Sequence, residues 1–465
     1  MRVLIPWGGA ATLAAIIALA LSQATLGSPL FFALTAVPCI VYALLLRDLL
    51  GAPIPGPEQN LRHHPWESPA TPTATDCARH LPRTDKPGSD PNWRADPNRR
   101  LLIAALLFAV AFRVPLAVPR VGADSDMVRY LYDGRLQRLG YNPYTVIPAD
   151  PAVAATHTEE TLKMPSLRAR TPYPAAAQLF FRLVVTIHES SRAMKLALVG
   201  CDLLTIAVLL AWLRSTHRSP WLALVYAWNP LVILEVAHSG HIDALGALWI
   251  ATSAWMLSTG RGMRAMIAFV VAVASKPLPI VLLPLYWKRV RPRDALVGGI
   301  VLAVLYFPFR SAGSLPLGAV PNVVAFIRFN GPLFKALAGF LTPQGAAGTA
   351  VLAGLAVAAW MRARTSADDP AAWAWPMAVS LAAAPVIYPW YLLYFTPFLF
   401  TRSTWPLIVW TYSALPVYVV WHLSRQGHRW IVPPWVMAIE FGAVLLAALF
   451  MLMRRRAQAT HGVGR

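Results

Sequence analysis

Charged residues and cysteines are both scarce in this 465-residue sequence. Only 13% of the residues are charged and 57% are hydrophobic, a composition that excludes a chain of soluble domains. Of the three cysteines, Cys39 and Cys201 lie in apolar segments and Cys77 lies in a polar one. No pair is therefore placed to form an external disulfide, and redox chemistry is not indicated.

Acidic residues are also few, 21 against 41 Lys and Arg, which gives a formal net charge of +20. In a soluble protein this excess would indicate nucleic acid as a partner. In an apolar chain the same excess mainly keeps loops on the cytoplasmic side of a membrane. We therefore expect no nucleic acid binding.

Long apolar runs are what the sequence has in abundance. A helix needs about 20 apolar residues to span a bilayer. Runs of this kind occur near residues 4–22, 29–46, 101–118, 193–213, 221–237, 241–258, 265–287, 294–309, 346–361, 371–387, 391–401, 404–421 and 435–453. They predict an all-α polytopic membrane protein, a bundle of about 11–13 transmembrane helices with a structured first long external loop.

The apolar runs divide the chain into four parts. Residues 1–48 hold two N-terminal transmembrane helices, and the first is interpreted as an uncleaved span because a second run follows it almost at once. Residues 49–100 form a polar linker with the composition of a disordered segment. Residues 101–453 form the main transmembrane domain with an external loop at 119–192, and residues 454–465 form a basic tail.

Clusters of Lys and Arg orient the helices in the membrane. The clusters occur at Arg47, Arg214, Arg261, Lys288, Arg362 and Arg454. They predict that both termini are cytoplasmic and that the loop at 119–192 lies outside the plasma membrane. The run at 265–287 breaks the alternation of cytoplasmic and external ends along the chain, because basic residues flank both its ends. A re-entrant pair of half-helices around Lys276 would restore it, and a single span with one misleading cluster is the alternative.

The external loop combines carboxylates with basic side chains. Asp124 and Asp126 lie just after a predicted transmembrane helix, where such a pair can serve as a general base or a metal site. The alternative is that one of them caps the helix that follows. Arg129 and Arg135 can hold a phosphate or form a basic surface for lipid headgroups. Apolar residues at helical spacing after Tyr130 predict short helices on the outer membrane surface.

A turn predicted to be external carries a second group of ionisable side chains, Glu235, His238, His241 and Asp243. His and Asp at this spacing can ligate a metal. Cavity lining is the interpretation we favour, because ionisable groups at membrane depth are costly and tend to face a site.

Lys276 lies inside an apolar run and requires an anionic partner. That partner is either a phosphate or a carboxylate on a neighbouring helix, unless the side chain snorkels to the membrane surface. Tyr388 and Trp390 fit an interfacial aromatic belt, which is the default interpretation for aromatic residues at a helix end.

Several short motifs follow one another in order between residues 101 and 453. They are Asp126-Met-Val-Arg129-Tyr130-Leu-Tyr132-Asp133-Gly134-Arg135, Gly140-Tyr-Asn142-Pro143-Tyr144, Tyr173-Pro174 with Gln178, Trp228-Asn229-Pro230, Gly240-His241-Ile-Asp243, Ser275-Lys276-Pro277, Phe329-Asn330-Gly331 and Pro389-Trp390-Tyr391. The ordered set resembles the bacterial GT-C membrane glycosyltransferases that use polyprenyl-phosphate sugars, particularly family 87 and the actinobacterial mannosyltransferase-like group.

The resemblance implies a GT-C-like bundle and a metal-independent, inverting transfer of a sugar, with mannose expected. The donor would be a polyprenyl-phosphate sugar and the acceptor a glycan or lipid at the outer face, so the partners are these substrates and membrane lipids. Asp126 would be the general base, with Asp124 as the second choice, and no cofactor is expected. The candidate substrate-binding residues are Arg129, Tyr130, Asp133, Arg135, Asn142, Tyr144, Tyr173, Gln178, His241, Asp243, Lys276, Asn330, Tyr388 and Trp390.

Two positions depart from the family pattern. Tyr132 stands where Trp is more frequent, and Tyr388 stands where His is common. The resemblance therefore leaves the sugar preference of the donor pocket open.

A secondary transporter or a flippase for lipid-linked sugars is the rival interpretation, because a broken helix with a buried Lys is ordinary in such proteins. The two halves of the sequence show no convincing duplication, and a transporter has no need of a long loop rich in both charges. Formation of transfer product in detergent, where no compartments exist, would identify an enzyme.

Overall fold

The computed structural model describes residues 1–22, 24–51, 98–118, 125–164, 166–311, 316 and 318–462. Most of the predicted linker, residues 52–97, and the candidate residue Asp124 lie outside the described residues. Within them every named element is a helix, and an isolated bridge joins Phe329 to Val386. The prediction of an all-α polytopic membrane protein is confirmed.

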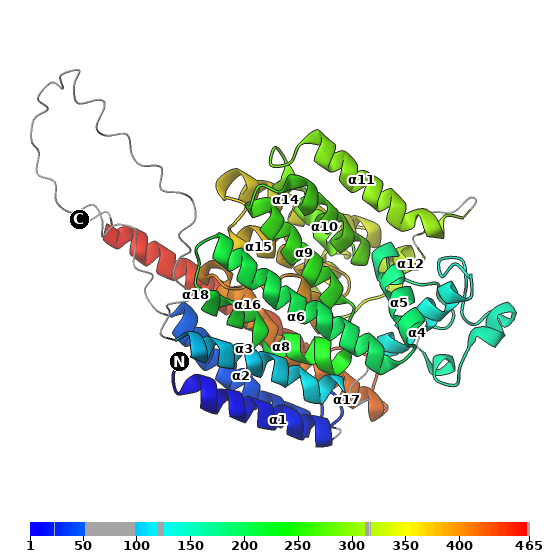
Figure 1. Cartoon of the computed structure of the whole chain (residues 1–465), viewed down its shortest axis with the longest axis horizontal. Coiled ribbons are helices and arrows are strands. Elements are labelled where there is room, and N and C mark those ends of the chain that lie inside the picture. Colours follow the sequence, from blue (N-terminus) through cyan, green and yellow to red (C-terminus); the bar gives the residue numbers. More distant parts are fainter. Residues whose placement is uncertain are drawn as a thin grey trace, which may run out of the picture.

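Most of the long elements run through the bundle in Figure 1. They are η1 and α1 (Leu4–Gly8, Gly9–Ser22), α2 (Pro29–Leu50), α3 (Arg99–Ala117), α6 (Ser191–Ser215), α11 and η10 (Pro292–Tyr306, Phe307–Phe309), α14 (Pro343–Arg364), η13, α16, η14 and α17 (Arg402–Thr404, Trp405–Ser413, Leu415–Tyr418, Val419–Arg425), and α18 (Pro434–Gly462).

The remaining elements are shorter. They are α4 (Ser125–Arg138), η5 (Pro151–Thr156), η6 (Thr161–Lys163), α5 (Ala175–Ile187), η7 (Pro220–Ala223), α7 (Leu224–Ala227), α8 (Pro230–Ile233), η8 (Leu234–Ser239), α9 (Asp243–Ser258), α10 (Gly262–Ser275), η9 (Leu278–Tyr286), α12 (Val320–Phe326), α13 (Pro332–Leu337), α15 (Pro370–Ala382), η11 (Pro389–Tyr394) and η12 (Thr396–Phe398).

Among the described residues, eight helices have the length and composition of membrane spans. A ninth results if Pro220–Ala227 and Pro230–Ser239, which are bent by 56° at their junction, count as one. The sequence predicts more, about 11–13. The difference arises because the runs at 241–258, 265–287 and 371–387 form helices of only 16, 14 and 13 residues. Pro277 shortens the helix in the run at 265–287, since proline lacks the N–H that continues a helix.

The run at 265–287 is broken at the predicted point. α10 ends at Ser275, the backbone of Lys276 is extended with φ −161° and ψ 144°, and the 3-10 segment η9 begins at Leu278. Pro277 removes a backbone donor directly after the break. A re-entrant course for this pair stays a prediction.

The external loop predicted between the third and fourth apolar runs folds into short helices, as expected. α4, η5, η6 and α5 project at one end of the bundle (Figure 1). The N-terminus and the C-terminal end of α18 lie at the opposite end. The predicted basic tail at 454–465 continues α18 as helix as far as Gly462.

The two N-terminal helices pack into the same bundle, next to α3 (Figure 1). The hydroxyl of Tyr42 donates to the carbonyl of Val225 at 2.5 Å, and Asn229 Nδ2 donates to that hydroxyl at 3.3 Å. Gly27, with φ +76°, approaches Tyr418 so closely that a Cβ would lie 1.9 Å from its carbonyl oxygen. Helices outside the family-like part of the sequence therefore support one of its motifs directly.

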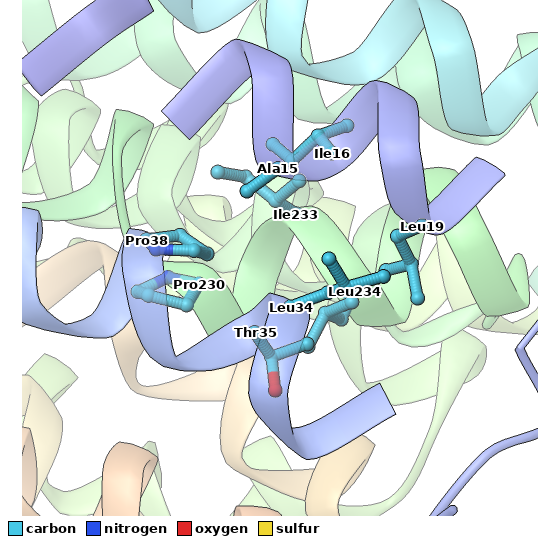
Figure 2. Close-up of a pocket in the computed structure, with 9 residues that line it drawn as sticks. All are labelled: Ala15, Ile16, Leu19, Leu34, Thr35, Pro38, Pro230, Ile233 and Leu234. Carbon is cyan, nitrogen blue, oxygen red and sulfur yellow. The ribbon is translucent and has the colours of Figure 1, made fainter. Parts of the chain in front are cut away.

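A narrow apolar hollow lies between these helices and α8 (Figure 2). Its room of about 10 Å³ is close to what a single water molecule needs. The hydroxyl of Thr35 on its wall donates to the carbonyl of Phe31 in its own helix at 2.8 Å. The hollow is a gap in the packing and too small for a substrate.

Candidate active site

Helix α4 begins at Ser125, so Asp126 occupies its first turn. A carboxylate there interacts favourably with the positive end of the helix dipole. Asp126 is half-buried, and its neighbour Met127 is fully buried. Met127 lies against the turn at Gly240, because a Cβ on that glycine would be 2.3 Å from the Met127 Cε. The start of α4 is therefore held against the turn that carries His241.

Aromatic packing holds the next turn of α4. The ring of Tyr130 stacks on Phe181 at 4.6 Å and meets Tyr173 edge-on at 5.1 Å. The backbone N–H of Ile242 donates to the Tyr130 hydroxyl at 3.4 Å. The two candidate tyrosines, Tyr130 and Tyr173, are thus brought together beside the turn that precedes α9.

Asp133 is the buried centre of a hydrogen-bond network inside the loop. It accepts hydrogen bonds from Arg129 Nε at 2.8 Å, from Thr171 Oγ1 at 2.6 Å and from Gln178 Nε2 at 2.8 Å. Gln137 in turn donates to Gln178. These contacts tie α4 to α5 and to the segment before it, so Asp133 and Gln178 hold the loop together.

Arg129 retains one unused donor within this network. Its Nη1 donates to the carbonyl of Ala169 at 3.0 Å. Its Nη2 is buried and has no hydrogen-bond partner among the described residues. A buried guanidinium N–H without an acceptor costs free energy, which an anionic ligand would recover.

Other predicted binding residues are engaged in holding the loop. Arg135 forms an ion pair with Glu189 and donates to the carbonyl of Thr156. Asn142 donates to the carbonyl of Phe309 at 2.9 Å, and the Tyr144 hydroxyl donates to the carbonyl of Tyr173 at 2.8 Å. The contacts of Arg135 therefore help to stabilise the loop.

The turn between η8 and α9 carries the second predicted group. η8 is a π-helix, a form that is rare and frequent at functional sites. Gly240 closes it in the left-handed conformation with φ +78°. His241 Nδ1 lies 2.8 Å from Glu235 Oε2, and both side chains are buried. The turn thus buries ionisable groups at the start of α9, where the sequence predicts a cavity lining.

Lys276 and Asp243 meet across this turn. The Lys276 ammonium lies 2.6 Å from Asp243 Oδ1 and 3.6 Å from the centre of the Tyr391 ring. The partner of Lys276 is therefore a carboxylate on a neighbouring helix, one of the alternatives left open by the sequence. Asp243 Oδ2 is buried without a hydrogen-bond partner among the described residues, so the pair is not fully satisfied.

Four rings form a continuous stack beside this pair. Phe329 stacks on Tyr388 at 4.3 Å, Tyr388 on Trp390 at 4.3 Å, and Trp390 on His241 at 3.9 Å. Trp390 is 5% exposed, so it does not belong to an interfacial belt. Because rings cover both faces of Tyr388 and of Trp390, these side chains orient His241 and leave no face for a sugar.

Asn330 anchors one end of the stack. It adopts φ +55°, and its Nδ2 donates to Glu440 Oε2 at 2.7 Å. The backbone N–H groups of Phe329 and Ile387 donate to the carbonyls of Pro385 and Phe329 at 3.1 and 2.9 Å. Glu440 is not among the residues predicted from the sequence, although a lone carboxylate in the apolar run 435–453 is a signal of a buried polar contact.

The electrostatic neighbourhood of Asp126 includes groups from four parts of the chain. Burial raises the pKa of Tyr130, and the negative charges of Asp126 and Asp243 raise it further. Burial also raises the pKa of Tyr173, followed by the effect of Asp126. The negative charge of Asp126 also interacts electrostatically with Lys276 and Tyr391. Asp126, Tyr173, Asp243 and Lys276 therefore border one polar region at the loop end of α9 and α10.

Within the described part of the chain, no three His, Cys, Asp or Glu side chains are arranged to hold a metal ion. Glu235, His238 and His241 lie close in sequence without forming such a group.

The long apolar helices define a multi-pass membrane protein. Residues 93–290 match the family model described as alpha-(1->6)-mannopyranosyltransferase, N-terminal domain. The match supports a glycosyltransferase of the mannosyltransferase type and confirms the resemblance found in the sequence. It includes Asp126, Asp243 and Lys276 but ends before the stack residues Phe329, Tyr388 and Trp390. No curated protein and no solved structure matches the chain significantly.

Proposed function

We propose that this protein transfers a sugar, with mannose expected, from a polyprenyl-phosphate carrier to a glycan or lipid acceptor. The reaction takes place at the outer face of the plasma membrane, with Asp126 as the general base. The observation that carries the proposal is that the start of α4, which holds Asp126, packs against the turn before α9 through Met127 and Tyr130, while Lys276 pairs with Asp243 at the same turn.

In the proposed reaction the Asp126 carboxylate takes the proton of an acceptor hydroxyl. The acceptor oxygen then attacks the anomeric carbon, and the bond between that carbon and the phosphate oxygen breaks. The electron pair leaves with the lipid phosphate, and the configuration at the anomeric carbon inverts. A phosphate is a good leaving group, so stabilising its charge matters more than protonating it.

Lys276 and Arg129 are the proposed contacts of the donor phosphate. An ammonium has three N–H donors, and only one needs to remain with Asp243 when a phosphate arrives. The orphaned Nη2 of Arg129 supplies a further donor from the loop. His241, held by Trp390 and Glu235, is the proposed contact of the acceptor or the sugar.

The test is an assay of Asp126→Asn in proteoliposomes with a radiolabelled polyprenyl-phosphate mannose. Loss of the base is expected to lower transfer at least about 100-fold. Asp150→Asn is the matched control, because the exposed Asp150 caps η5 through Ala152 N and asparagine caps equally well. Near-wild-type transfer by Asp126→Asn would refute the assigned role. Transfer from a nucleoside-diphosphate mannose alone would refute the lipid-linked donor.

The proposed sidedness has its own test. A single cysteine introduced at the exposed Glu160 of the loop, in a Cys77→Ser background, is expected to react with a membrane-impermeant thiol reagent on intact cells. A cysteine at the exposed Met263, at the other end of α10, should react only after the cells are permeabilised. The reverse pattern would place the loop in the cytoplasm.

A further inference from the structure

The end of the α9–α10 hairpin far from Asp243 and Lys276 holds a basic cavity. α9 runs for 16 residues from Asp243, which places its other end about 24 Å away. The cavity lies where the turn at Gly260 meets the turn before α11, and its volume is about 580 Å³. Its walls carry the arginines Arg261, Arg264, Arg289, Arg291 and Arg293, together with one carboxylate, Asp294.

The fold brings the two turns together through specific backbone features. Gly260 adopts φ +73°, which lets α9 end and α10 start within a tight turn. A Cβ on Gly262 would lie 2.7 Å from Asp294 Oδ2, so only glycine lets the turn approach α11 this closely. Asp294 is buried and accepts the backbone N–H of Arg291 at 3.0 Å. The one carboxylate is therefore occupied in capping α11.

The arginines are not neutralised by the described part of the chain. The ion-pair contact there is between Arg293 and Asp294 at 3.8 Å, and Arg293 is 72% exposed, so its contribution is small. Arg289 donates to the carbonyl of Thr365 through Nη2, while its buried Nη1 has no hydrogen-bond partner among the described residues. Burial lowers the pKa of Arg289, and the positive charge of Arg362 lowers it further. A bound anion would offset both effects.

We propose that this cavity, which we call the arginine cavity, binds the phosphate group of an anionic phospholipid headgroup. Guanidinium groups hold phosphate oxygens through paired N–H donors. Lysines would be enough to orient the chain in the membrane, whereas the walls of this cavity carry arginines. Basic pockets between transmembrane helices are suited to such headgroups. The cavity also adjoins membrane-embedded helices, because α11 exposes Leu296 and Ile300, which suits a ligand with acyl chains.

The experiment uses the purified full-length protein in a neutral detergent. Binding is measured for short-chain phosphatidylglycerol, for phosphatidylcholine and for inorganic phosphate. Wild type is expected to bind phosphatidylglycerol in preference to phosphatidylcholine. The triple variant Arg261→Gln/Arg264→Gln/Arg291→Gln is expected to bind it at least about tenfold more weakly. Arg47→Gln/Arg364→Gln, which neutralises exposed arginines near basic helix ends, is expected to bind as wild type does.

Each outcome bears on the proposal. Equal weakening in both sets of variants would overturn it, because it would show a general surface charge effect. No preference of wild type for phosphatidylglycerol would overturn it too. Displacement of phosphatidylglycerol by free phosphate, at similar affinity, would reassign the cavity to a soluble phosphate compound. A melting temperature close to wild type verifies that the triple variant is folded, and Arg289→Gln provides a second, single-site variant if it is not.

Discussion

The ammonium of Lys276 lies 2.6 Å from Asp243 Oδ1, although 33 positions separate the two residues. Asp243 starts α9, and Lys276 follows the last residue of α10. The α9–α10 hairpin thus brings the end of α10 back to the start of α9. It pairs two charges, each of which would be costly to bury without the other. Membrane-embedded charges are kept when they are paired and face a site.

Breaking this pair should destabilise the protein more than removing it entirely. Lys276→Met or Asp243→Asn alone leaves one buried charge, at a cost of about 3–5 kcal/mol in the free energy of unfolding. The double variant should recover most of that stability but no sugar transfer. Unfolding in a denaturing detergent and initial transfer rates measure the two effects. Additive losses in the double variant would mean that the two side chains are not coupled.

Loss of the Asp133 carboxylate should loosen the loop. Asp133→Asn leaves the guanidinium of Arg129 buried without its counter-charge, at a cost of about 3–5 kcal/mol. We expect faster proteolysis within residues 125–190 and a lower melting temperature. Asp150→Asn serves again as the control on the same loop. Unchanged proteolysis would show that the network does not determine the order of the loop.

The ring stack predicts a graded effect at Trp390. Trp390→Phe keeps a ring between Tyr388 and His241 and should retain most of the turnover. Trp390→Leu removes the stack and is expected to lower kcat about 10-fold to 100-fold, since a misplaced catalytic contact is costly. Because neither face of Trp390 is open to substrate, KM for the donor should change little. A large rise in KM with an unchanged kcat would indicate direct contact with the sugar instead.

Ionisation of the Tyr130 phenol should lower the free energy of unfolding in alkaline solution. In the unfolded chain its phenol ionises near the ordinary pKa of 10.0, whereas in the folded protein the pKa is well above that value. The folded state therefore holds one more proton above pH 10. Its contribution is complete below pH 10 and is lost as the pH rises, at up to about 1.4 kcal/mol per pH unit.

Tyr130→Phe should reduce the slope of the unfolding free energy against pH above 10. Tyr141→Phe, at a tyrosine that is 41% exposed, is the control for changes at an exposed phenol. Identical slopes for wild type and Tyr130→Phe would show that Tyr130 is not protected from ionisation in the folded state.

Much of this protein follows from its sequence because the bilayer permits few backbone structures. Apolar runs must become helices, since lipid offers no hydrogen-bond partner to the backbone. Pro277 after Lys276 predicts the break in that run, and the spacing around Tyr130 predicts a helix in the loop. The sequence also singles out Asp243 and Lys276, because charges inside apolar runs are rare.

Only the tertiary structure decides which of these residues meet. Packing of α9 against α10 pairs Lys276 with Asp243, whereas the sequence leaves phosphate and carboxylate open. Folding of the loop engages Arg135 with Glu189, and folding of the 329–331 segment places Phe329 on Tyr388. The arginine cavity likewise exists only because two turns converge. Contacts between residues far apart in the chain depend on how helices pack, and the local periodicity of the sequence does not determine that packing.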